Sequence, residues 1–245
     1  MSTETDLPDG VVVVGIDQPL VRNAVNTETA ARLHDAFVAF DADASARVAV
    51  LTGDDAAFCA GANLRDLPKL RDSGPLGPTR LQLSKPVIAA IEGWCVAGGV
   101  ELAAWCDLRV AGSSARFGCL ERRWGVPLID GGTYRLPQIV GVGRALDLIL
   151  TGREIGSEEA ERMGFLTRVV PDGEALAAAV ALAGQIASFP WRAVVNDRRS
   201  VYAGLGRELA DALALEDELG KDTIFADGFA AGVDRFNDHQ AGRRP

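Results

Sequence analysis

The residues best placed for chemistry lie within Lys85–Asp107. This stretch, KPVIAAIEGWCVAGGVELAAWCD, runs from a short apolar segment through a glycine-rich turn to a second apolar segment with one early carboxylate, Glu101. Glycine lets the backbone adopt positive φ and approach a ligand closely. The first N–H groups of a helix lack partners within it, so they can hold an oxygen that becomes negative during a reaction. A purely structural strand, turn and helix fits the same residues, with Glu101 serving only the helix dipole.

A second stretch upstream, Phe58–Leu64, favours the catalytic interpretation. Its sequence, FCAGANL, follows an apolar segment at Val48–Thr52 and a polar turn at Gly53–Asp55. Small residues again stand where a strand ends. Two such turns can each supply one N–H to a single carbonyl oxygen, which is the arrangement that stabilises an oxyanion.

Strand and helix patterns that can position these turns alternate along the chain. Val11–Asp17 is rich in β-branched residues and predicts a strand. The next apolar pattern predicts a helix with Thr27 as its N-cap. Thr133 and Ser157 are predicted as further caps, Ser157 within a capping box.

Two regions have a different character. Residues 65–80 contain three prolines and two glycines, so we expect an irregular, mobile loop there. From Asp172 onward the pattern is helical and rich in alanine and leucine, with breaks at Pro190, Gly204 and Gly220.

Composition excludes several classes of protein. With 245 residues, of which 48% are hydrophobic, the chain can bury one large core or two modest ones. A net charge of −9 argues against binding to nucleic acid or to an anionic membrane surface. No apolar run is long enough to span a bilayer, and the N-terminus lacks the pattern of a secretory signal, so we expect a cytoplasmic protein.

The cysteines and histidines do not indicate a metal site. The four cysteines form no CxxC pair, and the two histidines, His34 and His239, lie far apart in the sequence, so we expect no zinc. A disulfide framework is not expected in a chain with so ample a core. We expect the cysteines to be small buried hydrophobic residues, although Cys59 and Cys95 can also line a pocket between the two turns.

Three motifs together resemble one known family. FCAGANL, IEGWCVAGGVELAAWCD and RFGCLERRWGV, in this order and at these separations, resemble the enoyl-CoA hydratase/isomerase family, the crotonase superfamily. The resemblance extends from about Val11 to about Arg243. It implies an α/β fold, a crotonase-like spiral of ββα units with a helical C-terminal region that forms trimers. We therefore expect a core with an acyl-CoA site in residues 1–190 and a helical region in residues 191–245.

The resemblance also assigns residues to a site. It implies an acyl-CoA thioester whose carbonyl oxygen binds between the N–H groups of Ala62 and Gly98. Glu101 and Glu121 match the family's two catalytic glutamates, which hold a water between them. Arg22 lies in a loop that contacts the CoA phosphates in the family, although it also fits a solvated loop arginine. The other implied substrate contacts are Ala24, Ala60, Gly61, Asn63, Leu64 and Gly99.

The most informative departure from the family pattern is Asp130. Hydratases carry a small residue in this P-G-A-G-G-T region, where this chain reads P-L-I-D-G-G-T. An acidic residue here resembles dienoyl-CoA isomerases, in which it shuttles a proton, and aroyl-CoA dehalogenases, in which it is a nucleophile. Asp130 is therefore a third catalytic candidate, with a local Asx turn as the structural alternative. Asn63, where many members have Asp, is a milder departure.

The sequence thus predicts an enoyl-CoA hydratase, a hydro-lyase that adds water across the 2,3 double bond of a 2-enoyl-CoA in the manner of fatty acid β-oxidation. Hydratases of the family need no metal or redox cofactor, so the resemblance implies none; coenzyme A is part of the substrate. The resemblance also implies a homotrimer or a dimer of trimers. Three alternatives stay open: an enoyl- or dienoyl-CoA isomerase using Glu121 and Asp130, a non-catalytic acyl-CoA-binding homologue, and a CoA-independent relative acting on a C–C bond of a diketone.

Overall fold

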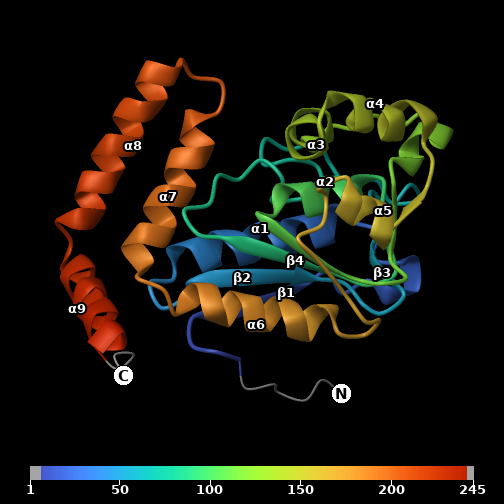
Figure 1. The fold of residues 1–245 in the computed structure, drawn as a ribbon. Coiled ribbons are helices and arrows are strands. Elements are labelled where there is room, and N and C mark those ends of the chain that lie inside the picture. The colour runs from blue at the N-terminus through green and yellow to red at the C-terminus, as the bar shows by residue number, and fades with distance from the viewer. Residues whose placement is uncertain (1–6, 242–245) are drawn as a thin grey trace. The chain divides into compact units, whose positions relative to one another are not determined.

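The computed structural model describes residues 7–241, and the chain divides into two compact units, Met1–Gly184 and Gln185–Pro245 (Figure 1). The first unit contains two sheets. The larger has five parallel strands in the order β1 (Val11–Gly15), β2 (Val48–Thr52), β4 (Val87–Ile91), β6 (Leu108–Gly112) and β9 (Arg168–Val170). The smaller has β3 (Ala57–Cys59), β5 (Trp94–Val96), β7 (Arg116–Gly118) and β8 (Ile155–Gly156), of which only the β7–β8 pair is antiparallel.

Helices surround and connect these sheets. In the first unit they are α1 (Thr27–Ala42), α2 (Gly98–Trp105), α3 (Gly132–Val140), α4 (Val142–Thr151), α5 (Ser157–Arg162) and α6 (Ala175–Ala187), which continues past the boundary of the unit, together with the short 3₁₀ helices η1 (Pro19–Val21) and η2 (Leu120–Trp124). The second unit contains α7 (Trp191–Gly204), α8 (Leu209–Ile224) and α9 (Asp227–Ala241). Within residues 7–241 no single helix is long and apolar enough to cross a membrane; only α6 and α7 taken together, as a bent pair, have the length and composition of a broken span.

The chain steps repeatedly from the large sheet to the small one, from β2 to β3, from β4 to β5 and from β6 to β7. Tight turns make these steps possible. At Gly93, between β4 and β5, φ is +57° and a Cβ atom would lie 2.1 Å from the carbonyl oxygen of Ala56. Only glycine fits such a position. Because β3, β5 and β7 are parallel neighbours, the segments that follow them all leave the small sheet at the same edge.

The core explains why the strands have nearly continuous apolar sequences. Both faces of the large sheet are covered, so β2 and β4 carry buried residues at consecutive positions. All eight residues of α2 are buried as well. Phe37 of α1 packs edge-to-face on Trp105 of α2, with ring centroids 4.8 Å apart, and joins the two helices. All four cysteines are free and buried, as the sequence predicted.

The predicted helix caps were wrong by one or two residues. Asn26, not Thr27, caps α1 by accepting a hydrogen bond from the Thr29 N–H (2.9 Å), because Asn26 is the last residue with extended backbone. The α5 helix already includes Ser157, whose hydroxyl donates to the Gly112 carbonyl (2.6 Å) instead of forming a capping box. The α3 helix starts at Gly132, before Thr133.

The second unit is organised by α7 and α8. The buried side chain of Asn196 in α7 donates to the Leu219 carbonyl (3.1 Å), to Asp222 Oδ2 (2.8 Å) and to Thr223 Oγ1 (2.9 Å) on α8. Arg192 adds a bidentate ion pair with the same Asp222. These contacts fix the register of the two helices.

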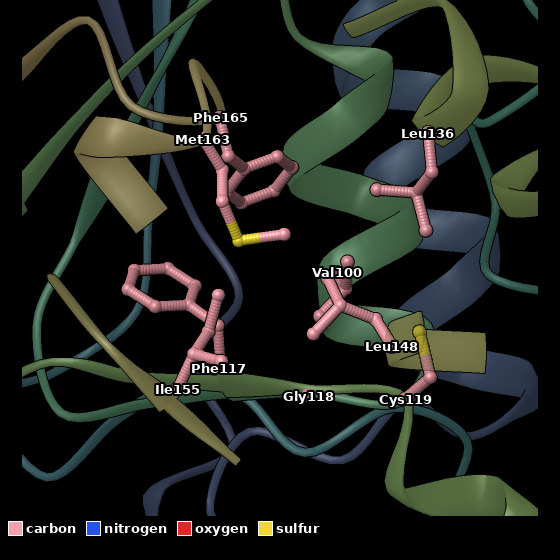
Figure 2. Close-up of a pocket in the computed structure, with 9 residues that line it drawn as sticks. All are labelled: Val100, Phe117, Gly118, Cys119, Leu136, Leu148, Ile155, Met163 and Phe165. Atoms are coloured by element: carbon pink, nitrogen blue, oxygen red, sulfur yellow. The ribbon is translucent and has the colours of Figure 1, made fainter. Parts of the chain in front are cut away.

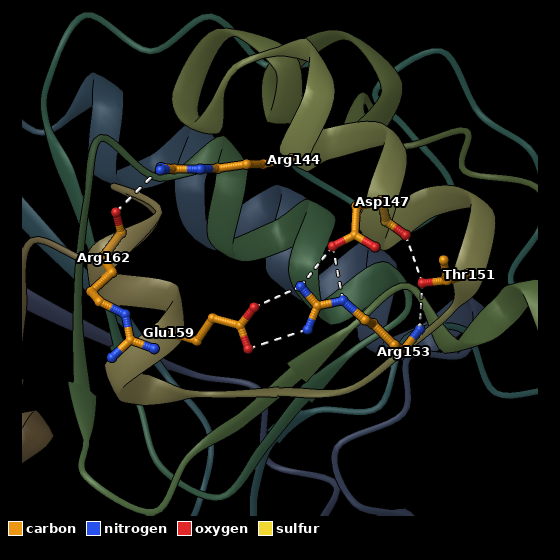
Figure 3. Close-up of polar contacts among 6 residues, drawn as sticks. All are labelled: Arg144, Asp147, Thr151, Arg153, Glu159 and Arg162. Atoms are coloured by element: carbon orange, nitrogen blue, oxygen red, sulfur yellow. Dashed lines mark hydrogen bonds and ion pairs between the residues drawn. The ribbon is translucent and has the colours of Figure 1, made fainter.

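An ion-pair cluster in the first unit joins α4 to α5 (Figure 3). The guanidinium of Arg153 donates to Asp147 Oδ2 through Nε (2.8 Å) and Nη2 (2.6 Å). It also donates to Glu159 through Nη1 (3.2 Å) and Nη2 (2.6 Å). Arg162, in contrast, pairs with Glu158 on its own helix, and the two side chains are 63% and 86% exposed.

This difference predicts unequal contributions to stability. We expect Arg153→Met to lower the free energy of unfolding by about 1 kcal/mol, because the planar guanidinium connects two carboxylates at once. Arg162→Met should change it by less than about 0.5 kcal/mol, as is usual for an exposed pair within one helix. Urea denaturation of both variants measures the two values. Equal losses would mean that the cluster contributes no more than an ordinary surface pair.

Candidate active site

The two small-residue turns meet after the parallel strands β3 and β5. Gly61 has φ +88°, and a Cβ atom on it would lie 2.7 Å from the Gly98 nitrogen and 3.0 Å from the Ala97 Cβ. Ala97 itself has φ +52° and precedes the first turn of α2. Left-handed backbone is costly for alanine and is typical of functional sites. The contact requires glycine at position 61, and it brings the segment around Ala62 against the start of α2.

The backbone pairing orients the N–H of Ala62. Val25 donates to the Gly61 carbonyl (2.8 Å) and accepts from the Asn63 N–H (2.8 Å). Ala62 lies between these two residues, so its N–H faces away from Val25. Gly98 is the first residue of α2, and its N–H has no partner within the helix. Neither N–H donates to any acceptor within residues 7–241. Both are therefore free to bind an acceptor, and that they share one carbonyl oxygen as an oxyanion hole stays a prediction.

Glu101 lies in the first turn of α2 and is only 3% exposed. Its Oε1 accepts hydrogen bonds from the N–H groups of Asp130 (2.9 Å) and Gly132 (2.8 Å). Burial raises the pKa of Glu101 to about 7, because desolvation of the carboxylate outweighs the N–H donors and the nearby charge of Asp130 adds to the effect. Glu101 can thus exist in either protonation state near neutral pH.

Glu121 lies in η2 and is 5% exposed. Both of its carboxyl oxygens are buried, and neither has a hydrogen-bond partner in the part of the chain that the structure describes. Burial raises its pKa above the usual range, and its charge is close enough to Glu101 to raise the pKa of that group too. An unpartnered buried carboxyl is costly and is characteristic of a catalytic group.

Asp130 is also buried, with 3% exposure. Its Oδ1 accepts from the Leu76 N–H (3.0 Å) and from the Thr79 hydroxyl (2.5 Å). Burial raises the pKa of Asp130, and the bond from Thr79 opposes this. Its side chain therefore bonds a distant segment of the chain instead of forming an Asx turn, and it lies against Glu101 through its own N–H.

The remaining predicted site residues fall into two groups. Arg22 has an exposed side chain and φ +54°, but its carbonyl accepts from the Ala60 N–H (3.0 Å), which places its loop against the oxyanion turn. Leu64 is 52% exposed, at the outer end of the same turn. Gly61 lies against Gly98, and Gly99 lies against the carbonyl of Cys59, next to Ala60 in the chain. Val25, which follows Ala24, pairs with Gly61 and Asn63.

Three residues of this region were not predicted. Asn23 is 1% exposed with φ +56°, and its side chain bonds the Gln18 N–H (2.7 Å), Asp54 Oδ2 (3.0 Å) and the Ala57 carbonyl (2.7 Å). Asparagine tolerates left-handed backbone, so an asparagine in this loop was the sequence signal that could have predicted the role of Asn23. Leu76 and Thr79 belong to residues 65–80, which are irregular as predicted, yet residues 74–79 are buried. Nothing in that segment signals its distant partner.

An apolar cavity is lined in part by residues close in sequence to the two glutamates (Figure 2). A cavity of about 10 Å³ lies beside Val100, which precedes Glu101, and Cys119, which is two residues before Glu121. Its lining offers almost no polar partner for a water and keeps the local dielectric low. The full lining consists of Val100, Phe117, Gly118, Cys119, Leu136, Leu148, Ile155, Met163 and Phe165. Within residues 7–241, no group of three or more His, Cys, Asp or Glu side chains is arranged to hold a metal ion.

Comparison with known proteins identifies the family. The model of the enoyl-CoA hydratase/isomerase family matches residues 6–242. Enoyl-CoA hydratase EchA19 of Mycobacterium tuberculosis is 34% identical over 98% of both chains. A short-chain-enoyl-CoA hydratase of Clostridium acetobutylicum is 36% identical over 85% of this chain and 84% of that relative. A crystal structure of an enoyl-CoA hydratase from Mycobacterium tuberculosis has a TM-score of 0.90 and 33% identity, and the match covers 94% of this chain and 93% of that one.

These matches confirm what the three motifs predicted: the chain belongs to the enoyl-CoA hydratase/isomerase family, the crotonase superfamily, and has its α/β fold, with two sheets of mainly parallel strands followed by C-terminal helices.

Proposed function

We propose that this protein hydrates 2-enoyl-CoA thioesters. Membership of the family implies an acyl-CoA substrate. The observation that carries the finer proposal is the pair of buried glutamates, Glu101 and Glu121, near two N–H groups that have no acceptor in the described part of the chain. Relatives with 34–36% identity bear the name enoyl-CoA hydratase, which supports the same reaction.

In the proposed reaction the thioester carbonyl oxygen accepts hydrogen bonds from the N–H groups of Ala62 and Gly98. When water adds at C3, negative charge moves onto this oxygen and a thioester enolate forms. Both donors belong to backbone that is already fixed, so they need no reorganisation as the charge develops. Removing one donor of this kind costs about 3 to 4 kcal/mol of transition-state stabilisation.

The two glutamates take different roles because their partners differ. Two N–H groups stabilise the anion of Glu101, and its Oε2 accepts no hydrogen bond within residues 7–241, so this oxygen is suited to take a proton from the attacking water. The side-chain oxygens of Glu121 accept no hydrogen bond within residues 7–241, and burial raises its pKa. Its carboxyl is therefore free to hold the proton that it delivers to C2.

We also propose that the chain assembles as a homotrimer or a dimer of trimers. In the second unit, Phe229 and Phe236 of α9 are 47% and 61% exposed, and Phe225 before it is 85% exposed. Large apolar side chains gathered in one short region are typical of a surface that another chain covers.

One observation favours a second candidate, a double-bond isomerase. Asp130 presents a third buried carboxyl with a raised pKa beside Glu101. In that reaction Glu121 and Asp130 would move a proton between two carbons without adding water. Conversion of a 3-enoyl-CoA into its conjugated 2-enoyl isomer raises the ultraviolet absorbance, whereas hydration of a 2-enoyl-CoA lowers it, so one assay separates the two candidates.

Hydration should require both glutamates. We expect the wild-type protein to remove the ultraviolet absorbance of crotonyl-CoA, and Glu101→Gln or Glu121→Gln to slow this at least about 100-fold, because glutamine keeps the shape but cannot exchange a proton. Glu158→Gln, on the exposed face of α5, is the matched control and should retain full activity. A wild-type protein that binds enoyl-CoA esters but leaves their absorbance unchanged would overturn the hydratase proposal.

Stability should depend on pH through Glu101. Its folded pKa of about 7 lies above the ordinary value of 4.5, so between these values the unfolded chain loses the proton first. The free energy of unfolding therefore falls as pH rises through this window and stays reduced above it, by about 3 kcal/mol for this group. Glu101→Gln keeps an oxygen that can accept the two N–H hydrogen bonds but has no titrating proton, so its free energy of unfolding should not fall by this amount.

Urea denaturation of both proteins at pH 4.5 and pH 7.5 measures the effect. The remaining carboxyls titrate in both proteins, so the difference between the two isolates Glu101. If wild type and Glu101→Gln lost the same stability between these pH values, Glu101 would not have a raised pKa.

A further inference from the structure

Asp130 and Gly132 donate their N–H groups to Glu101, and the side chain of Asp130 also binds a second segment near the site. Two hydrogen bonds converge on one oxygen of Asp130, from the Leu76 N–H (3.0 Å) and from the Thr79 hydroxyl (2.5 Å). Both donors belong to residues 74–79, which we term the anchored segment, and all six of its residues are buried. The buried carboxyl of Asp130 is thus the point at which this segment attaches to the α3 end of the site.

Two arginines reinforce the attachment. Arg135 of α3 donates to the Asp130 carbonyl through Nη1 (3.0 Å) and to the Thr79 carbonyl through Nη2 (2.6 Å). Arg80 donates to the Ile129 carbonyl through Nη2 (2.7 Å). Arg135 thus reaches from α3 to the anchored segment, and Arg80, directly after that segment, reaches back to the residue before Asp130.

Glycines in the anchored segment allow this close approach. Gly74 has φ +98°, and a Cβ atom on it would lie 2.0 Å from Thr79 Oγ1 and 2.9 Å from Asp130 Oδ1. Gly77 has φ +105°, and its Cβ atom would lie 2.4 Å from the Ala30 carbonyl of α1. Any other residue at these positions would clash or adopt a strained backbone. The backbone is therefore shaped to bring Leu76 and Thr79 to the carboxyl.

Leu76 connects the junction to the oxyanion site. Its side chain is 1% exposed, and its Cδ1 lies 2.5 Å from where a Cβ atom on Gly98 would stand. Asp130 thus holds Leu76 against Gly98 through its carboxyl, and it holds Glu101 through its N–H. One residue contacts both halves of the proposed catalytic machinery.

We propose that Asp130 is a positioning residue. By binding the anchored segment, it fixes the Leu76 side chain that packs against Gly98, and it fixes the two N–H groups that donate to Glu101. The role needs a hydrogen-bond acceptor at Oδ1 and no proton transfer. The inference rests on the proposed hydratase function only for its effect on catalysis, since the attachment itself is a property of the fold.

Three variants separate this role from a proton shuttle. Asp130→Asn keeps the acceptor and should retain crotonyl-CoA hydration within about threefold, whereas Asp130→Ala and Thr79→Val should each lower kcat/KM about tenfold or more by breaking buried hydrogen bonds. A proton shuttle requires the reverse order, with a large loss in Asp130→Asn and little change in Thr79→Val. In Asp130→Ala and Thr79→Val the pH profile should also shift, because the donors to Glu101 are no longer fixed.

Amide hydrogen exchange tests the attachment without any activity. The Leu76 N–H should exchange slowly in wild type and Asp130→Asn, and faster in Asp130→Ala and Thr79→Val, as read on peptides covering residues 74–80. The control is Thr29→Val, because the Thr29 hydroxyl is equally buried but has no partner within residues 7–241. It should change neither exchange nor activity.

The outcomes are distinguishable. Thermal unfolding shows whether each variant folds, and Thr79→Val carries the test if Asp130→Ala does not. Unchanged exchange at Leu76 in a folded Thr79→Val protein, or loss of hydration in Asp130→Asn with wild-type exchange, would overturn the positioning role. Altered exchange in a protein that shows no hydratase activity would support the attachment and reject the proposed function instead.

Discussion

The backbone contact between Gly61 and Gly98 is the constraint on which the rest of the site depends. A Cβ atom at position 61 would lie 2.7 Å from the Gly98 nitrogen, so any side chain there would separate the two turns. The parallel pairing of β3 with β5 brings the turns to one edge, and the pairing of Val25 with Gly61 and Asn63 sets their direction. Gly61, which precedes Ala62, therefore lies directly against Gly98 with no side chain between them.

Burial raises the pKa of three carboxyl groups, which differ in their hydrogen-bond partners. Glu101 accepts from two N–H groups, Asp130 from an N–H and a hydroxyl, and Glu121 from no group within residues 7–241. Desolvation raises the pKa of all three, while each hydrogen bond to the anion opposes the rise. Three buried carboxyl groups with raised pKa values thus lie in one region, where such groups can give or take a proton closer to neutral pH than an exposed carboxyl can.

The sequence predicted the parts of this arrangement that depend on local pattern. The apolar runs at β2 and β4 and the small-residue turns after β3 and β5 all follow from residue type and spacing. It did not predict contacts that depend on tertiary structure. The bond between Thr79 and Asp130 spans 51 residues, and a loop rich in proline and glycine looks mobile until its buried partner is known. Helix starts were misplaced for a related reason, since Asn26 and Gly131 compete with neighbouring threonines for the cap.

The unpartnered carboxyl of Glu121 has a consequence for how this protein can be engineered. Replacing it by an apolar residue of similar volume would remove a buried polar group that costs about 1 to 3 kcal/mol when unsatisfied. A search for heat-resistant variants, by calculation or by selection on solubility, would therefore favour apolar substitutions at this position. Such substitutions would remove the proposed proton donor. Thermostabilisation of this fold has to hold position 121 fixed and look for its gains elsewhere.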